Sequence, residues 1–270
     1  MSTTDKNFAG SIPQIYDRFL VPLIFQPYAR DLAELIARVE PGEVLETAAG
    51  TGVLTQAIVA RLPAQARIIS TDLNQPMLDH ASTKPIPRDR VTWQQADALA
   101  LPFEHERFDV VTCQFGAMFF PDKVKGYCEA RRVLKRGGRF VFNVWDRISE
   151  NEFADVVTDA VAKLFPQDPP LFLARTPHGY HETDRIREDL VAAGFTDISI
   201  ETVGHASKAA SASEPAIAYC QGTPLRNEIE ARDAARLDAA TLSAADALAS
   251  RFGNGPVVGR IRAHVITATA

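Results

Sequence analysis

Between residues 41 and 146 the chain alternates between two hydrophobic periods, and this alternation restricts the fold more than any other feature. Five apolar runs are typical of strands: EVLETAA (43–49), ARIISTDL (66–73), RVTWQQAD (90–97), FDVVTCQF (108–115) and GRFVFNVWD (138–146). Helical patterns lie between most of them, as in LTQAIVARL (54–62) and DKVKGYCEARRVLKRGG (122–138), which ends at Gly137–Gly138. Strands that alternate with helices predict βαβ units, and therefore an α/β fold with a doubly wound, mostly parallel sheet.

Further elements are predicted on both sides of this region. Leu32, Leu35, Ile36 and Val39 follow the i, i+3, i+4, i+7 spacing of an amphipathic helix that ends at Pro41–Gly42. After residue 150 we expect helices over 150–165, 182–195 and roughly 212–252, a proline-rich loop over 166–182, a strand over 196–204 and a last strand over 263–269. No internal repeat interrupts this order.

The composition excludes several classes of partner. The formal net charge is −5, so no basic field is available to hold a nucleic-acid backbone. No apolar run approaches 18 residues, which argues against a membrane span, and MSTTDKNFAGSIPQ lacks the order of a signal peptide. The three cysteines are scattered, so we expect reduced, buried thiols in a cytoplasmic protein, neither metal ligands nor a disulfide framework.

The stretch VLETAAGTGVLT (44–55) predicts a strand, a glycine-containing turn and the start of a helix. This backbone cradles ligands, but the third glycine of a dinucleotide fingerprint is replaced by Thr55. The phosphate-loop pattern G-x-x-x-x-G-K-[ST] does not occur either. The loop alone therefore leaves its ligand open.

Three acids narrow the choice. Glu46, Asp72 and Asp97 end the first three predicted strands, whose carboxyl ends meet along one crevice of a doubly wound sheet. Such acids repel a pyrophosphate. They suit a ligand with a ribose diol, an amine and a positive centre, and S-adenosylmethionine (SAM) has all three.

The chain resembles the class I SAM-dependent methyltransferases, in particular the small-molecule group that includes the ubiquinone/menaquinone methyltransferases. The matching residues are VLETAAGTG (44–52), STDLNQPML (70–78), QQADALALPF (94–103), FDVVTCQFGAMFF (108–120) and RVLKRGGRFVFNVW (132–145). The resemblance implies a three-layer, Rossmann-like methyltransferase fold with seven strands, in which 263–269 forms an antiparallel strand after a helical insertion. It also implies a single domain over 1–270, with a helical lid (1–40), a SAM-binding core (41–150), a substrate-side segment (151–256) and the last strand (257–270).

The resemblance further implies the cofactor contacts. The loop backbone at Ala48, Gly50 and Gly52 would lie against the methionine part of SAM, and Ala48 stands where the family usually has glycine, which is tolerable if φ is negative. Asp72 would accept from the ribose and Asp97 from the adenine amine. Leu73 and Met77 would pack on the adenine, with the backbone of Ala98 beside Asp97, and Gln114 and Phe115 would line the methionyl and methyl end. Glu46 is a further candidate for binding the cofactor, and Tyr16 or Arg18 of the lid would reach its carboxylate.

We therefore interpret the chain as a SAM-dependent methyltransferase that methylates O, N or C of a small organic acceptor by in-line displacement, with S-adenosylhomocysteine (SAH) as product. His178 and His181 are the candidate general bases, because histidine exchanges a proton near neutral pH. Two alternatives stay open: an NAD-dependent oxidoreductase and a non-catalytic SAM-binding subunit. A homodimer also stays open.

Overall fold

The structure is a computed structural model that describes residues 10–270. Residues 1–9, which hold most of the stretch tested for a signal peptide and the start of the expected lid, lie outside the described residues. The chain forms two compact units. The sheet unit comprises Gln26–Val144, His181–Val203 and Ala263–Ala270, and the helical unit comprises the residues up to Phe25 with Trp145–Tyr180 and Gly204–Arg262. The single-domain organisation remains a prediction.

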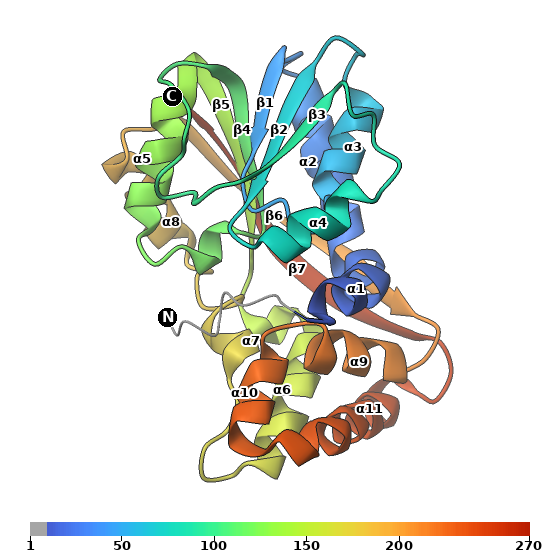
Figure 1. The fold of residues 1–270 in the computed structure, drawn as a ribbon. Helices are drawn as coiled ribbons and strands as arrows, with labels where there is room; N and C mark the ends of the chain where they lie inside the picture. The colour runs from blue at the N-terminus through green and yellow to red at the C-terminus, as the bar shows by residue number, and fades with distance from the viewer. Residues whose placement is uncertain (1–9) are drawn as a thin grey trace. The chain divides into compact units, whose positions relative to one another are not determined.

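Seven strands form one sheet in the order β3-β2-β1-β4-β5-β7-β6 (Figure 1). Their bounds are β1 Glu43–Glu46, β2 Arg67–Asp72, β3 Val91–Gln95, β4 Phe108–Gln114, β5 Leu134–Trp145, β6 Thr196–Ala209 and β7 Val257–Thr269. The first five are parallel; Val44 of β1, for example, pairs with Ile68 of β2 and with Val110 of β4. The predicted doubly wound, mostly parallel sheet is confirmed.

β7 is the antiparallel strand. The amide of Ala270 donates to the carbonyl of Gly138, and at the other end of β5 the amide of Asp146 donates to the carbonyl of Arg262. As β5 advances, its partner strand therefore runs backwards, which is the antiparallel arrangement. The prediction of a final antiparallel strand beside the fifth is confirmed.

The helices of the sheet unit cover both faces of its strands. Helices α2 (Gln26–Ala37), α3 (Val53–Arg61) and α4 (Gln75–Ser82) lie on one side in Figure 1, and α5 (Lys123–Val133) and α8 (Thr183–Ala192) lie on the other. Leu32 and Ile36 of α2 pack with Ile58 of α3 against buried strand residues such as Val44 and Val110. The core thus fixes β1 and α3, the two elements that carry the loop 47–52.

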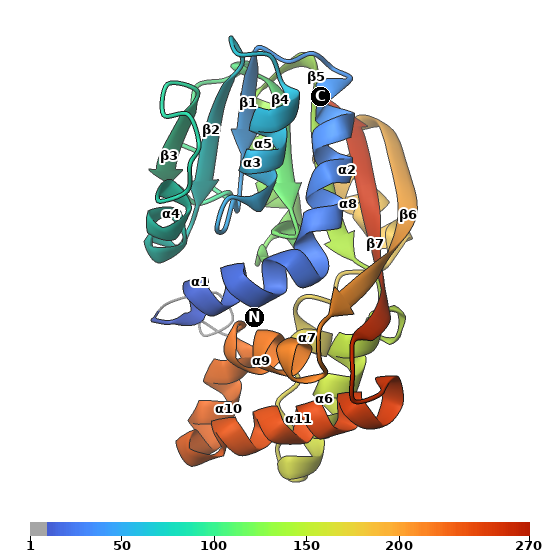
Figure 2. The same cartoon turned by 90° about the vertical axis from the view of Figure 1, so that its right-hand side faces the viewer.

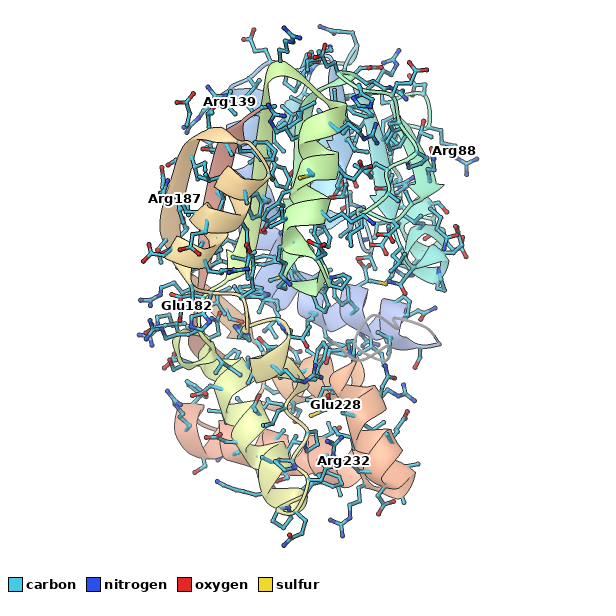
Figure 3. All side chains as sticks on the ribbon, turned by 90° about the vertical axis from the view of Figure 1, so that its left-hand side faces the viewer. Arg88, Arg139, Glu182, Arg187, Glu228 and Arg232 are labelled. Carbon is cyan, nitrogen blue, oxygen red and sulfur yellow. The ribbon has the colours of Figure 1, made fainter. Side chains whose placement is uncertain are left out.

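The helical unit contains α1 (Ile12–Ile15), a π-helix η2 (Tyr16–Phe25), α6 (Glu152–Leu164), α7 (Phe172–Arg175), α9 (Ser213–Gln221), α10 (Leu225–Asp233) and α11 (Leu237–Phe252) (Figure 2). Short 3₁₀ turns lie at Ile148–Glu150, Ala234–Arg236 and, in the sheet unit, Ala117–Phe119. Glu228 on α10, labelled with Arg232 in Figure 3, accepts from the amides of Leu171 and Phe172 and from Arg175 at 2.6 Å. It thereby ties α7 to α10.

The predicted helix over 122–138 is wrong at its end, since α5 stops at Val133 and Leu134 already pairs with Phe108 in the sheet. The next β4 partner, Val110, pairs with Arg139, so the extra residues form a bulge in which Gly137 has φ +75°. Lys135 in this bulge pairs with a carboxylate: its Nζ lies 2.7 Å from Asp109 Oδ1. The Gly-Gly pair therefore marks a bulged strand.

Other boundaries differ as well. The predicted helical stretch over 212–252 consists of α9, α10 and α11, and the loop 166–182 contains α7. Val39 lies beyond the end of α2 and is 40% exposed. Cys128 is exposed, while Cys113 and Cys220 are buried and none of the three forms a disulfide. In the described part of the chain, no helix has the length and apolarity needed to cross a membrane.

Candidate active site

The loop between β1 and α3 has three residues in left-handed backbone conformation. They are Ala48 (φ 54°), Gly50 (φ 56°) and Gly52 (φ 81°). The loop is held on both sides of Ala48, because the Thr47 amide donates to the Thr112 carbonyl and the Ala49 amide to the Thr71 carbonyl, each at 2.9 Å. The expectation that a negative φ makes alanine tolerable here is wrong: the two flanking hydrogen bonds hold Ala48 in a region that favours glycine.

The Cβ atom of Ala48 lies against Gly116, which follows β4. A Cβ atom added at Gly116 would lie 2.4 Å from the Ala48 Cβ and 2.7 Å from the Cys113 Sγ. Gly52 is similarly restricted, since an added Cβ would lie 2.8 Å from the Trp93 ring. The loop and the end of β4 are therefore packed without room for one further carbon.

Gly116→Ala is expected to lower the free energy of unfolding by about 2 kcal/mol, because the overlap with the Ala48 Cβ cannot be relieved without moving backbone and the Cys113 Sγ must also shift. In an Ala48→Gly background the cost should fall to about 1 kcal/mol, since only the overlap with Cys113 remains. Urea denaturation of the wild type, both single variants and the double variant measures this coupling. Equal costs of Gly116→Ala in the two backgrounds would show that Ala48 and Gly116 are not in contact.

Glu46 ends β1 and is 1% exposed. One carboxylate oxygen accepts from the Ser70 hydroxyl at 2.9 Å and from the Thr55 hydroxyl. Burial raises the pKa of Glu46 from 4.5 to about 7, and the nearby Asp72 contributes to the same direction. Thr55, which replaces the third glycine of the dinucleotide pattern, thus donates a hydrogen bond to this buried carboxylate.

Asp72 ends β2 and holds the loop from the neighbouring strand. Its Oδ2 accepts from the amide of Gly50 at 2.9 Å, and its Oδ1 accepts from the amide of Asn74 at 2.8 Å. Burial raises the pKa of Asp72 above its ordinary value. Glu46 and Asp72 therefore form a buried acidic pair that a cation would stabilise.

The expected adenine residues lie around the start of α4 and the end of β3. Leu73 is 43% exposed and offers an apolar surface beside Asp72, whereas Met77 is buried in α4. Asp97 does not end β3, which stops at Gln95; it lies in the following turn, where its Oδ1 accepts from the Leu99 amide at 2.9 Å. The strand is shorter than predicted because Asp97 turns the chain, as aspartates commonly do.

Gln114 and Phe115 follow at the end of β4. Phe115 is buried, has φ 51° and contacts the Tyr28 ring edge-on at 5.3 Å. Its amide donates to Asn143 Oδ1 at 2.9 Å, so Asn143 of β5 fixes this strained residue. No local pattern pointed to Asn143, because its role depends on the pairing of β4 with β5.

These residues fit the polar, positively charged cofactor expected from the sequence. The buried polar atoms without a hydrogen-bond partner in the described sheet unit include Oγ1 of Thr51, in the loop, and Nδ2 of Asn143. Buried polar atoms without partners are rare and favour an absent ligand or water. The acidic pair, the left-handed loop and the exposed Leu73 agree with SAM in the same place.

Three predicted site residues, Tyr16, His178 and His181, lie outside the loop and the strand ends described so far. Tyr16 lies in the helical unit, where its ring stacks on Phe25 at 5.0 Å. His178, also in the helical unit, is 6% exposed, and its Nδ1 lies 2.8 Å from the Asp146 carbonyl oxygen. His181 belongs to the sheet unit and lies 3.6 Å from the exposed carboxylate of Glu182. Their roles at the site stay predictions.

Comparison with known proteins agrees with this geometry. A family model described as "Methyltransferase domain" matches residues 44–138. The demethylmenaquinone methyltransferase of Deinococcus radiodurans is 31% identical over 173 residues, which is 60% of this chain and 71% of the relative. The ubiquinone/menaquinone biosynthesis C-methyltransferase of Idiomarina loihiensis is 41% identical over 175 residues, 60% of this chain and 69% of the relative.

A solved structure supports the fold. The phosphoethanolamine N-methyltransferase 2 of Haemonchus contortus, solved with S-adenosylhomocysteine, aligns with a TM-score of 0.54 at 18% identity and covers 88% of this chain and 52% of its own. With the sheet, the acidic pair and the relatives in agreement, the oxidoreductase alternative has no support. The chain belongs to the class I SAM-dependent methyltransferases, in the group that includes the ubiquinone/menaquinone methyltransferases, and it is an enzyme that uses SAM.

Proposed function

We propose that the chain methylates a ring carbon of a small quinone-type acceptor in its reduced form. The observation that carries this proposal is the 31–41% identity to demethylmenaquinone and ubiquinone/menaquinone C-methyltransferases over more than two thirds of their length. The net charge of −5 argues in the same direction, because it disfavours a nucleic-acid acceptor. We place the enzyme in the cytoplasm, as the composition suggests, and leave its oligomeric state open.

Different residues bind the different parts of SAM. Asp72 accepts from the ribose hydroxyls, Asp97 from the adenine amine, and Leu73, Met77 and Ala98 pack on the adenine. The loop backbone at Ala48, Gly50 and Gly52 and the side chains of Gln114 and Phe115 surround the methionyl end, and Tyr16 reaches its carboxylate. Glu46, with its two hydroxyl donors, supports the loop and contributes negative charge.

When bound, SAM supplies a methyl group on a positively charged sulfur, which leaves with the bonding electron pair. Because this methyl group is already activated, the protein accelerates the reaction mainly by orientation and exclusion of water. An attacking ring carbon must also lose its proton. That proton goes to a base, and the hydroxyl groups of a reduced quinone supply the electron density for the attack.

We assign the base to His178. The Asp146 carbonyl can only accept, so the hydrogen-bonded Nδ1 carries the proton and Nε2 is the basic nitrogen of the neutral ring. The orientation is further restricted by the Trp145 ring, 5.9 Å away between centroids. His181 is more exposed, with 26% of its side chain accessible, and its Nε2 lies 3.6 Å from the Glu182 carboxylate, so we assign it second place as the base.

His178→Ala is expected to lower kcat by tenfold or more with little change in SAM affinity, since a positioned base contributes to proton transfer and not to cofactor binding. The acid side of the kcat–pH profile should flatten in the variant, which loss of packing alone does not produce. His181→Ala serves as the matched control and should retain most of kcat. Equal losses in both variants would remove His178 from the mechanism.

A panel of acceptors tests the proposed reaction. The protein is incubated with SAM and a reduced 2-alkyl-1,4-naphthoquinone, a catechol, a primary amine, RNA or an unrelated protein, and products are analysed by mass spectrometry. We expect methylation on ring carbon of the reduced naphthoquinone. Turnover on the catechol or amine alone would retain the methyltransferase but overturn the acceptor, and methylation of RNA or protein alone would overturn the small-molecule assignment.

A further inference from the structure

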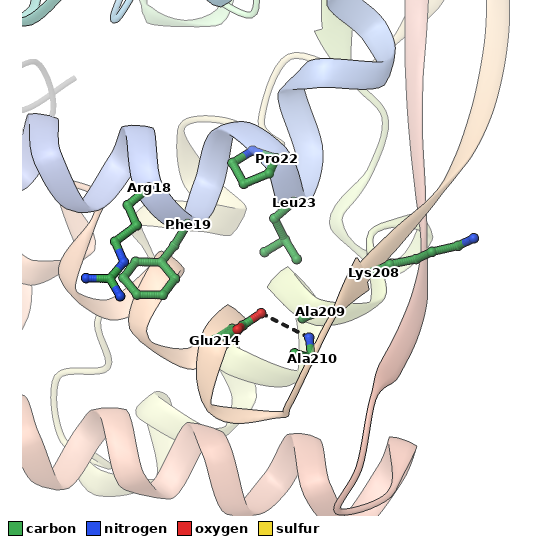
Figure 4. A pocket seen from close by; sticks show the side chains of 8 residues that line it. All are labelled: Arg18, Phe19, Pro22, Leu23, Lys208, Ala209, Ala210 and Glu214. Atoms are coloured by element: carbon green, nitrogen blue, oxygen red, sulfur yellow. Dashed lines mark hydrogen bonds between the residues drawn. The ribbon is translucent and has the colours of Figure 1, made fainter.

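A hollow of about 430 Å³ opens within the helical unit. Four of its lining residues belong to the π-helix η2, three to the end of β6 and its continuation, and one to α9: Arg18, Phe19, Pro22, Leu23, Lys208, Ala209, Ala210 and Glu214 (Figure 4). Its volume lies in the lower part of the range for small-molecule pockets. The hollow is therefore large enough for one aromatic ring system.

The π-helix gives the hollow its apolar wall. Residues four and five positions apart share a face of a helix with i to i+5 hydrogen bonds, so Arg18 lies on the same face as Pro22 and Leu23. In Figure 4 the Phe19 ring lies beside the Arg18 guanidinium, and Leu23 lies between Phe19 and the end of β6. The wall thus combines three apolar side chains with one cation.

Arg18 is an exposed side chain that forms no ion pair with a carboxylate of residues 10–270, and its guanidinium lies over the Phe19 ring, 4.9 Å from the centroid. Glu214, by contrast, accepts from the Ala210 amide at 3.0 Å and sits in the first turn of α9, where a negative charge is favourable. The Lys208 side chain extends away from the other lining residues in Figure 4, so Arg18 is the cation of the apolar wall. The Arg18 guanidinium therefore has no carboxylate partner in the described residues, whereas the Glu214 carboxylate already accepts a hydrogen bond.

We propose that this hollow binds a small organic anion with an apolar body, of the class of aromatic carboxylates. The carboxylate pairs with the Arg18 guanidinium, which can donate two parallel hydrogen bonds. The apolar body lies against Phe19 and Leu23. This site is independent of the identity of the methyl acceptor, and it stands if the acceptor proposed above is wrong.

Three probes with one apolar body test the charge preference: 2-naphthoate, 2-naphthamide and 2-naphthylmethylammonium, each titrated into the whole protein by calorimetry. We expect naphthoate to bind saturably at one site, about tenfold more tightly than the amide, because a charge-assisted hydrogen bond contributes about that factor. Tighter binding of the ammonium probe would show that Glu214 governs the hollow and would overturn the proposal, as would the absence of saturable naphthoate binding.

Variants locate the site. Arg18→Gln is expected to weaken naphthoate binding about tenfold. Arg30→Gln, an exposed arginine in the sheet unit, carries the same charge change and should bind naphthoate as the wild type does. Wild-type naphthoate binding by Arg18→Gln would overturn the proposal. Parallel loss of naphthoate and SAM in that variant would assign Arg18 to the cofactor and overturn it equally.

Discussion

Replacing Asp72 by alanine is expected to weaken the binding of SAM by about 100-fold, or about 3 kcal/mol. Two losses add in this variant. The acceptor for the ribose hydroxyls disappears, and the Gly50 amide loses the carboxylate that holds it at 2.9 Å, so the loop is no longer tied to β2. Isothermal titration with SAM and with SAH measures the effect.

Two further variants separate these losses. Asp72→Asn keeps an oxygen for the Gly50 amide but lacks the charge, and should weaken binding by about tenfold. Asp79→Ala removes a carboxylate from the exposed side of α4, where it contacts only Gln75, and serves as the charge-matched control. Binding of SAM by Asp72→Ala within threefold of the wild type would remove Asp72 from the site.

Glu46→Gln is expected to remove a pH dependence of stability worth about 3 kcal/mol between pH 4.5 and pH 7. The pKa of Glu46 is about 7 in the folded protein and 4.5 in the unfolded chain. Below pH 4.5 the carboxyl is protonated in both the folded and the unfolded chain, so its burial does not lower the free energy of unfolding through ionisation. As the pH rises, the unfolded chain releases this proton first, so the wild type loses stability until the pH passes 7.

Denaturant titrations of the wild type and of Glu46→Gln at pH 5, 6, 7 and 8 test this expectation. The difference between the two proteins should grow in favour of the variant across that range, since glutamine never ionises. Glu43→Gln is the control, because Glu43 lies on the same strand with its side chain 41% exposed. A constant difference between wild type and Glu46→Gln would show that Glu46 does not carry the pH dependence.

The sequence predicted the sheet well because buried parallel strands are continuous apolar runs that few other structures produce. Glu46 and Asp72 end strands as predicted, since strand ends follow from the same runs. The end of α5 was wrong because a Gly-Gly pair is compatible with both a helix end and a bulge. Only the pairing of Phe108 with Leu134 distinguishes them, and such pairing is not local.

The site was less accessible to sequence reasoning for the same reason. Thr55 and Ser70 reach Glu46 from a helix and a neighbouring strand, and Asn143 reaches the Phe115 amide from the next strand. Each contact joins residues that no local pattern connects. The π-helix was also missed, because its residues read as an ordinary amphipathic segment and its wider turn is a tertiary outcome.

The contact between Ala48 and Gly116 limits the order in which this loop can change. The Ala48 Cβ takes up part of the space that a side chain at position 116 needs, and the Cys113 Sγ takes up another part. The cost of a side chain at 116 therefore depends on the residue at 48. Mutational libraries built on this enzyme should vary the two codons jointly, because a scan of single substitutions measures position 116 only in the presence of alanine at 48.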